Sequence, residues 1–224
     1  MHNERIEAIV FDFDGTLAEL HIDFLAMKRH VGALAEEYLQ TRLPLPPQPA
    51  LEWLENLQRE IRKNDPSLAN EFQRRASSLI MELELEAADR GSLFPFTRRI
   101  LAILSDRGVK TGIITRNCEK AVTKVFPDMG GFCSAFLARE HVLRVKPHPE
   151  HLHRALEKLM AAPAAALMVG DHPMDIQTGR SAGTLTAGVL SGNSSRTDLI
   201  ASGAHWTASD CEELLNVLIA EKIV

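Results

Sequence analysis

The sequence predicts an α/β protein: a Rossmann-like parallel sheet core flanked by helices, with a small α-helical domain inserted after the first strand. Two observations support this prediction. From residue 95 onward, short apolar runs alternate with helix-like segments, as in a parallel sheet wrapped by helices. Residues 19–91 instead form a long, charged and amphipathic stretch of helical character. We therefore predict an α/β core of residues 1–18 and 92–224 and an α-helical domain of residues 19–91.

The core sheet is expected to contain six strands, of which the first is the apolar run before Asp12 and the last is the weakest. Gly108 lies where a C-cap glycine would end the first helix of the second core segment. The strands are predicted at residues 6–11, 110–115, 134–138, 165–170, 185–190 and 204–207, and the helices at 98–106, 118–125, 149–160, 173–182 and 209–221.

The inserted domain is expected to consist of helices separated by a proline-rich break at residues 43–49. Leu79, Leu83 and Ala87 recur at helical spacing. Residues 81–86 also alternate between apolar and acidic, which fits a half-buried strand as well. Because Leu, Glu and Ala dominate this segment and β-branched residues are scarce, we favour the helix.

Composition and charge exclude several classes of partner. The chain has 224 residues, and 30 acidic against 25 basic side chains leave a formal net charge of −5. That balance provides no basic surface for nucleic acid or an anionic membrane, so we expect neither partner. About six apolar residues precede Asp12, far fewer than a secretion signal or a membrane span needs. We expect a cytoplasmic protein, either a monomer or a weak homodimer.

The three cysteines agree with that location. Cys118, Cys133 and Cys211 are widely spaced and include no CxxC pair. We therefore expect neither a disulfide framework nor a thiolate zinc site, and a reducing compartment fits best.

Two carboxylates follow the first predicted strand, in the run Asp12-Phe13-Asp14-Gly15-Thr16. Once the chain curls out of the sheet at Gly15, both can reach the crevice beyond the carboxyl ends of the strands. One carboxylate could act as a nucleophile while the other transfers protons. Because adjacent carboxylates repel each other, a divalent cation is implied.

A second group of candidates follows the strand predicted at residues 110–115. The hydroxyl of Thr115 and the N–H groups of the next turn would face the same edge as Asp12, which makes a cradle for phosphate. A simple helix N-cap is the alternative for Thr115. Arg116 could bind a substrate carboxylate or phosphate, or lie along the surface. Asn117, in the same turn, is a further candidate for substrate binding.

Three more candidates, Lys146, Asp171 and Asp175, lie further along the chain. Lys146 precedes Pro147, which restricts it to an extended backbone and would hold its ammonium group for phosphate, unless it is a solvated surface lysine. Asp171 and Asp175 follow the strand predicted at 165–170 and span the first turn of a helix. They could supply oxygen ligands to Mg²⁺, or they could be acids favoured at a helix N-terminus.

In their order and separation, these residues resemble the four motifs of the haloacid dehalogenase superfamily. The match covers essentially the whole chain. The inserted domain is similar to the α-helical cap of the first subfamily, which includes phosphoglycolate phosphatase-like enzymes, β-phosphoglucomutase and phosphonoacetaldehyde hydrolase. The residues that carry the resemblance are Asp12-Phe13-Asp14-Gly15-Thr16, Thr115, Lys146-Pro147, and Gly170-Asp171 with Asp175.

The resemblance implies a Mg²⁺-dependent phosphatase for a small phosphorylated metabolite, a phosphoglycolate-like monoester, with the cap setting specificity. Asp12 would be the nucleophile that forms an aspartyl-phosphate, and Asp14 would protonate the leaving alcohol and then activate water. The metal would be held by Asp12, the backbone carbonyl of Asp14 and Asp171, supported by Asp175. The implied catalytic residues are thus Asp12, Asp14, Thr115 and Lys146, the substrate-binding residues Thr115, Arg116, Asn117 and Lys146, and the metal-binding residues Asp12, Asp14, Asp171 and Asp175.

Other functions are compatible with the same motifs. A phosphomutase of the β-phosphoglucomutase type would have to protect its aspartyl-phosphate from water. A non-catalytic module would bind Mg²⁺ and phosphate without turnover. The presence of Asp14 argues against halide removal, and a phosphonatase would need a reactive cap lysine such as Lys28 or Lys63.

Several residues near these motifs have more ordinary explanations. Cys118, at a predicted helix start, could be an oxidation-sensitive thiol but is expected to be a small, partly buried residue. His148, His151, His153 and His172 have mixed spacing and provide no clean set of metal ligands.

Overall fold

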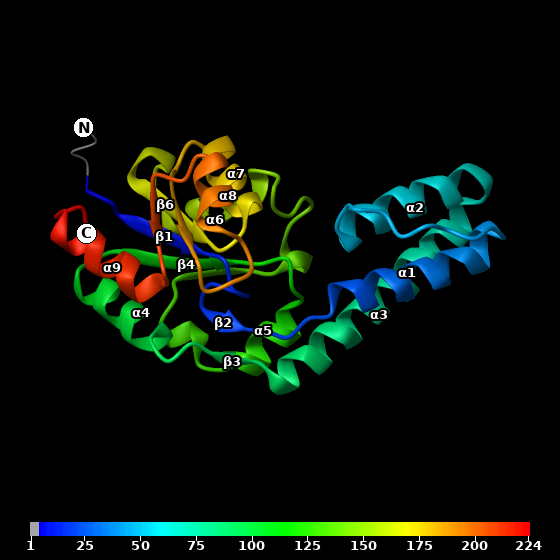
Figure 1. Ribbon diagram of the computed structural model, residues 1–224, viewed down its shortest axis with the longest axis horizontal. Coiled ribbons are helices and arrows are strands. Elements are labelled where there is room, and N and C mark those ends of the chain that lie inside the picture. The colour runs from blue at the N-terminus through cyan, green and yellow to red at the C-terminus, as the bar shows by residue number, and fades with distance from the viewer. Residues whose placement is uncertain (1–4) are drawn as a thin grey trace. The chain divides into compact units, whose positions relative to one another are not determined.

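The computed structural model describes residues 5–224 of the chain (Figure 1). Residues 1–4, which begin the predicted core and the N-terminal segment considered above, lie outside the described residues. The chain divides into two compact units. The α/β unit contains the residues before His21 together with Gly91–Val224, and the helical unit is His21–Arg90.

The α/β unit is built on a parallel sheet of six strands, which confirms the predicted fold class. The strands are β1 (Ala8–Phe11), β4 (Lys110–Ile114), β5 (Ala135–Leu137), β6 (Ala166–Gly170), β7 (Leu185–Val189) and β8 (Trp206–Ala208). Their order is β5-β4-β1-β6-β7-β8, so β1 lies between β4 and β6. Phe11, the last residue of β1, is level with Ile113 and Val169. The carboxyl ends of these three strands therefore meet at one edge.

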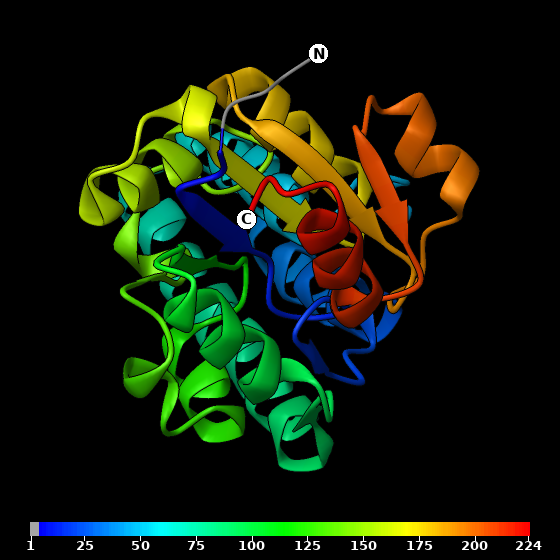
Figure 2. The same ribbon diagram turned by 90° about the vertical axis from the view of Figure 1, so that its left-hand side faces the viewer.

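Helices cover both faces of this sheet (Figure 2). On one face, α6 (Glu150–Leu159) packs against Ala8 and Val10 of β1. On the other face, Ile9 and Phe11 lie among apolar side chains of α4 (Thr97–Asp106) and α9 (Cys211–Ala220). Because successive strand residues point to opposite faces and both faces are covered, β1 is apolar throughout. The other helices of this unit are α5 (Glu119–Val125), α7 (Pro173–Ala182) and α8 (Arg196–Ala201).

Besides three 3₁₀ helices at Met129–Gly131, Arg139–His141 and Pro163–Ala165, three short elements were not predicted. α8 begins after Ser195, whose hydroxyl accepts the N–H of Asp198 at 3.2 Å. β2 (Ala18–Glu19) and β3 (Ser92–Leu93) form an antiparallel pair where the chain leaves and rejoins the α/β unit. Elements of this length are too short to show a period of 2 or 3.6 residues in the sequence. The predicted helix end at Gly108 is confirmed: α4 ends at Asp106, Arg107 is its C-cap, and Gly108 follows with a φ of +74°.

The helical unit consists of α1 (Phe24–Leu39), α2 (Ala50–Asn64) and α3 (Pro66–Arg90). Residues 81–86 are helical within α3, so the helix prediction there is confirmed. Trp53 and Phe72 are buried in the apolar core between the three helices. A Cβ on Gly32 of α1 would lie 2.7 Å from the Trp53 ring, so the close packing of α1 on α2 requires a glycine at that position.

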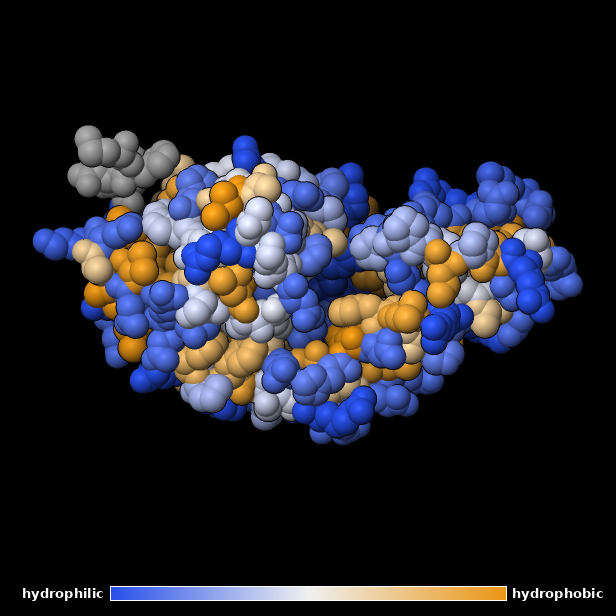
Figure 3. Space-filling model, in the orientation of Figure 1, coloured by the Kyte–Doolittle hydropathy of each residue, from blue (hydrophilic) through white to orange (hydrophobic). Residues whose placement is uncertain are grey.

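Hydrophilic residues dominate the face of each unit seen in Figure 3, and smaller apolar areas are scattered among them. Within residues 5–224, no helix combines the length and the apolar character that a membrane crossing requires.

Candidate active site

Three carboxylates from two distant segments of the chain come together at the carboxyl edge of the sheet. Asp12 follows β1, Asp171 follows β6, and Asp175 lies in the first turn of α7. Each contributes an oxygen, and these atoms all lie within 4.8 Å of one another. Asp175 can approach because Gly170 has no side chain: a Cβ there would overlap the Asp175 carboxylate. The adjacent positions of β1 and β6 therefore build the centre of the site.

Lys146 lies within this cluster and not on the surface. Its Nζ is 2.7 Å from Oδ1 of Asp12 and 2.6 Å from Oδ1 of Asp175, and its side chain is 2% exposed. The lysine belongs to the loop between β5 and α6, far in sequence from both carboxylates. Two carboxylates that bind a buried ammonium group fix the orientation of the lysine side chain and keep it protonated.

Burial and mutual repulsion leave these carboxylates poorly compensated. Burial raises the pKa of Asp12 to about 6, the charge of Asp175 adds to this, and Lys146 opposes it. Burial likewise raises the pKa of Asp171 to about 8, with Asp12 and Asp175 acting in the same direction. Burial lowers the pKa of Lys146, but the charges of Asp12 and Asp175 outweigh this and the net shift is upward. The site thus has more acid groups than its single lysine can neutralise.

The donor set fits a hard divalent cation. The clustered groups are carboxylate oxygens, the ligand type that Mg²⁺ prefers, and the raised pKa values of Asp12 and Asp171 show that a cation between them would be stabilising. Asp12 and Asp171 are the members that follow directly on strands, and Asp175 is also bound by Lys146. The residues present are therefore suited to hold Mg²⁺.

Asp14 lies in the same loop but its carboxylate has a different partner. Its Oδ1 accepts the N–H of Leu20 at 2.8 Å, and its carboxylate is not part of the group of three. Burial raises the pKa of Asp14 to about 7, while the bond from Leu20 opposes this and the charge of Asp12 adds to it. The structure therefore separates the two carboxylates of the first motif into different environments.

The loop after β7 forms a wall of the site that the sequence analysis did not identify. The hydroxyl of Ser191 donates to the carbonyl of Gly15 at 2.7 Å. Asp171 is packed between two glycines: a Cβ on Gly15 would lie 2.6 Å from its carboxylate carbon, and a Cβ on Gly192 would overlap its carboxylate. Gly15 also has a φ of +76°. The position of Ser191 and Gly192 directly after the predicted strand at 185–190 was the available signal.

The turn after β4 contains the predicted substrate-binding residues. Thr115 is buried, and its hydroxyl accepts the N–H of Asn117 at 3.1 Å. The residue preceding α5 is Cys118, so Thr115 is not the N-cap of that helix. The side-chain nitrogen of Asn117 is buried and has no hydrogen-bond partner among the described residues. Arg116 donates to the backbone carbonyl of Lys146 at 3.3 Å, which brings this turn beside the lysine loop.

The histidines near the motifs bind backbone groups, and the cysteines carry free thiols. Nδ1 of His172 accepts the N–H of Met174, and Nδ1 of His148 accepts the N–H of Glu150. His151 is fully buried at the start of α6. Burial raises the pKa of the Cys133 thiol to about 12. All three cysteines carry thiols, not disulfides, in the described structure.

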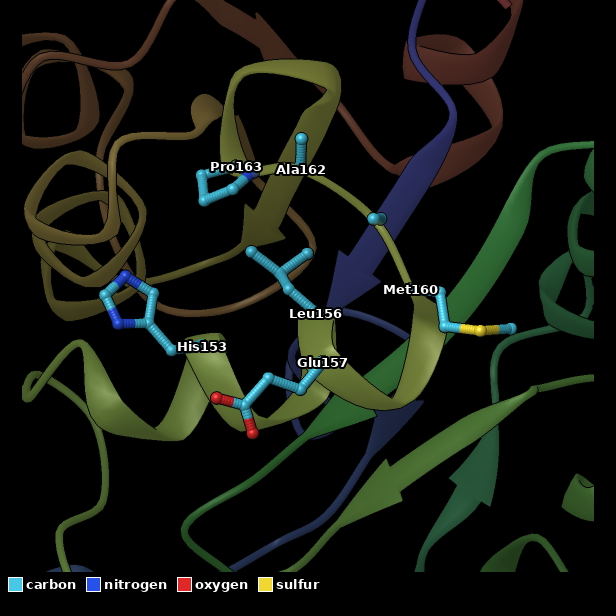
Figure 4. Close-up of a pocket in the computed structure, with 7 residues that line it drawn as sticks. His153, Leu156, Glu157, Met160, Ala162 and Pro163 are labelled. Carbon is cyan, nitrogen blue, oxygen red and sulfur yellow. The ribbon is translucent and has the colours of Figure 1, made fainter.

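A hollow elsewhere on the α/β unit lies at the opposite edge of the sheet (Figure 4). It is formed by the end of α6 and the loop before β6, with His153 and Glu157 one helical turn apart on its wall. Since β6 starts beside it, this hollow is at the amino edge, away from the carboxylates. It does not contribute to the cluster described above.

Comparison with known proteins agrees with the geometry. A family model described as haloacid dehalogenase-like hydrolase matches residues 6–183. A haloacid dehalogenase-like hydrolase domain-containing protein of Arabidopsis thaliana is 30% identical over 184 residues, which are 81% of this chain and 70% of that protein. The N-acetylmuramic acid 6-phosphate phosphatase of Pseudomonas putida is 29% identical over 202 residues, which are 84% of each chain.

Solved structures share the fold. A hydrolase from Pseudomonas syringae superposes with a TM-score of 0.70 at 21% identity and covers 96% of this chain and 98% of its own. A predicted phosphoglycolate phosphatase from Haemophilus somnus has a TM-score of 0.63 at 19% identity and covers 95% and 97%. At these identities the likeness shows the fold alone.

Proposed function

Because the chain belongs to the family of haloacid dehalogenase-like hydrolases, we propose that it is a Mg²⁺-dependent phosphatase acting on a small phosphorylated metabolite, a phosphoglycolate-like monoester. One observation carries this proposal: buried Lys146 binds Asp12 and Asp175 inside a cluster of three carboxylates, while Asp14, which follows the same strand as Asp12, stands apart from them. An ionised carboxylate beside a cation suits a nucleophile, and a carboxyl group with a raised pKa suits an acid and base.

In the proposed reaction, a carboxylate oxygen of Asp12 attacks the phosphorus of the ester, and the bond from phosphorus to the alcohol oxygen breaks. Protonated Asp14 donates its proton to that oxygen. The resulting carboxylate of Asp14 then takes a proton from water, whose oxygen attacks the aspartyl-phosphate and releases inorganic phosphate. A pKa of about 7 makes both forms of Asp14 available near neutral pH.

The other residues would bind the phosphoryl group and the cation. Lys146 would compensate charge on the transferring oxygens, and Thr115, Arg116 and Asn117 would bind them from the turn after β4. Asp12, the backbone carbonyl of Asp14 and Asp171 would hold Mg²⁺, with Asp175 in support. The cation would supply positive charge that allows a phosphate dianion to approach two carboxylates.

We place the enzyme in the cytoplasm, with a small-molecule phosphate ester as its partner, on the composition arguments given above. We further propose that the helical unit selects the substrate, as the resemblance to capped members of the family implies. The monoester named for the Pseudomonas putida relative makes N-acetylmuramic acid 6-phosphate a suitable member of a test panel beside phosphoglycolate.

The test is release of inorganic phosphate from such a panel, together with a generic aryl phosphate, in the presence and absence of Mg²⁺. Asp12→Asn should abolish release, and Asp128→Asn, at an exposed ion pair with Arg98, should not change it. A requirement for a bisphosphate with slow hydrolysis would instead identify a mutase. No release from any ester by a folded protein that binds Mg²⁺ would overturn the proposal.

A further inference from the structure

His151 connects the loop that carries Lys146 to the sheet. It lies in the first turn of α6 and is 0% exposed. Its Nε2 is 3.0 Å from the backbone carbonyl oxygen of Leu137, the last residue of β5. Its Nδ1 is 3.4 Å from the backbone nitrogen of Lys146. One buried ring therefore bridges the carboxyl end of a strand and the residue whose ammonium group binds Asp12.

The two partners define the protonation state of the ring. The N–H of Lys146 can only donate, so Nδ1 must accept and carries no proton. The carbonyl of Leu137 can only accept, so Nε2 must carry the proton and donate. The structure therefore requires the neutral imidazole with its proton on Nε2.

The electrostatic environment of His151 keeps the ring neutral. Burial lowers the pKa of His151 to about 4, and the positive charges of Lys146, His141 and Arg116 act in the same direction. The bond to the Leu137 carbonyl opposes this shift. Of the neighbouring charges, His141 is itself paired with Glu119, whose Oε2 is 3.2 Å from Nε2. Because burial and these positive charges disfavour the protonated ring, the acceptor on Nδ1 is retained at neutral pH.

Other contacts hold the remaining atoms of Lys146. Arg116 donates to its backbone carbonyl at 3.3 Å, and Asp12 and Asp175 bind its ammonium group. The backbone N–H is bound by His151. The lysine is therefore restrained at both ends of its backbone as well as at its charged tip.

We propose that His151 is a positioning residue: its Nδ1 accepts the backbone N–H of Lys146 and so sets the approach of the lysine to Asp12, while its bond to Leu137 keeps the proton on Nε2. The expected effect on catalysis rests on the phosphatase activity proposed above. The hydrogen bonds of His151 are observed independently of that activity. A displacement of the lysine of even a fraction of an ångström weakens contacts that form fully only in the transition state.

A pair of amide substitutions separates positioning from packing. In His151→Asn, the side-chain oxygen stands where Nδ1 was and can still accept the N–H of Lys146. In His151→Gln, the amide nitrogen reaches the place of Nε2 and can still donate to Leu137, while the acceptor at the place of Nδ1 is lost. We expect kcat of His151→Gln to fall about tenfold with KM little changed, and kcat of His151→Asn to stay within about threefold of the wild type.

The matched control is His153→Asn, two residues along the same helix, where Nε2 contacts the carbonyl of Ala182 at 3.3 Å. It should leave kcat unchanged. Thermal unfolding of all three variants measures packing separately. Equal kcat values for His151→Asn and His151→Gln at comparable stability would overturn the positioning role.

A second measurement does not depend on activity. Imidazole ¹⁵N chemical shifts should show His151 as the neutral ring with the proton on Nε2 throughout the neutral range. A proton on Nδ1, or a charged ring at neutral pH, would overturn the proposal even in an active enzyme. A wild-type protein that shows the expected tautomer but hydrolyses no ester would contradict the proposed function instead, so the two failures are distinguishable.

Discussion

Two buried, oppositely charged side chains of the α/β unit, Lys146 and Asp175, bind each other at the carboxyl edge of its sheet, whereas the described helical unit has Glu84 as its one buried charged residue. The core of the helical unit is apolar, around Trp53 and Phe72. Burying a charge costs free energy unless it is paired, so a fold retains such groups where they do chemistry or fix a structure. The contrast shows that the helical unit is held by apolar packing, and it supports the proposal that the α/β unit carries the reaction.

If the polar groups at the carboxyl edge of the sheet serve the reaction, replacing one of them should reduce the reaction rate more than the stability of the fold. Asp14→Asn keeps an oxygen for the N–H of Leu20 but removes the proton donor. We expect formation of the aspartyl-phosphate from an alkyl ester to slow about 10³-fold. An aryl phosphate should be affected much less, because its phenolate leaves without protonation. Rapid quench with both substrates measures this, and equal losses would contradict the acid role of Asp14.

In the helical unit, loss of a buried apolar side chain should instead reduce stability strongly. Trp53 is buried against Gly32 and the core of three helices. Trp53→Ala should lower the free energy of unfolding by about 3–5 kcal/mol, measured by urea denaturation. Trp206→Ala, at a half-buried position in the α/β unit, is the matched control and should cost less. A larger loss at Trp206 would show that apolar packing is not what distinguishes the helical unit.

The buried ring of His151 makes the α/β unit sensitive to acid. Its pKa is lowered from 6.5 to about 4 in the folded protein, so the unfolded chain binds a proton first as the pH falls. The stabilisation that the neutral ring of His151 contributes is therefore complete above about pH 6.5, and about 3 kcal/mol of it is lost progressively down to about pH 4. Urea denaturation across this window, compared between wild type and His151→Asn, isolates the contribution. The same acid loss in the variant would assign it to other groups.

A glycine beside the carboxylates provides the finest test of the site. Because a Cβ on Gly192 would overlap the carboxylate of Asp171, Gly192→Ala should displace that ligand and weaken Mg²⁺ binding about tenfold. Calorimetric titration with Mg²⁺ measures this without reference to turnover. Gly130→Ala, where the added carbon meets nothing within 4 Å, is the control. Unchanged affinity in Gly192→Ala would mean that Asp171 does not bind the cation.

The sequence predicted the sheet and the edge at which its candidate residues gather. Apolar runs that end at Asp12, Thr115 and Asp171 identify strand ends, and in a parallel sheet every such end lies at the same edge. It left open whether Lys146 was a surface lysine and whether Thr115 capped a helix. Only contacts between distant segments distinguish these alternatives, as in the bond of Lys146 to Asp175 across 29 residues.

The parts of the site that the sequence analysis missed have the same physical origin. Gly192 and Ser191 close the site from a loop whose contact with Gly15 spans 176 positions along the chain. In the sequence nothing distinguishes His151 from the neighbouring histidines. Its role follows from its two ring nitrogens, which contact Leu137 and Lys146. No local pattern records either contact.

Local physical chemistry was therefore sufficient for the alternation of strands and helices, the helical insertion and the chemical identity of the acidic motifs. These depend on side-chain periodicity and on residues near in sequence. The direction of each carboxylate, the burial of Lys146 and the neutral state of His151 arose only from packing. They depend on which segments become neighbours when the sheet forms, because desolvation and hydrogen bonding act over a few ångströms in space and not along the chain.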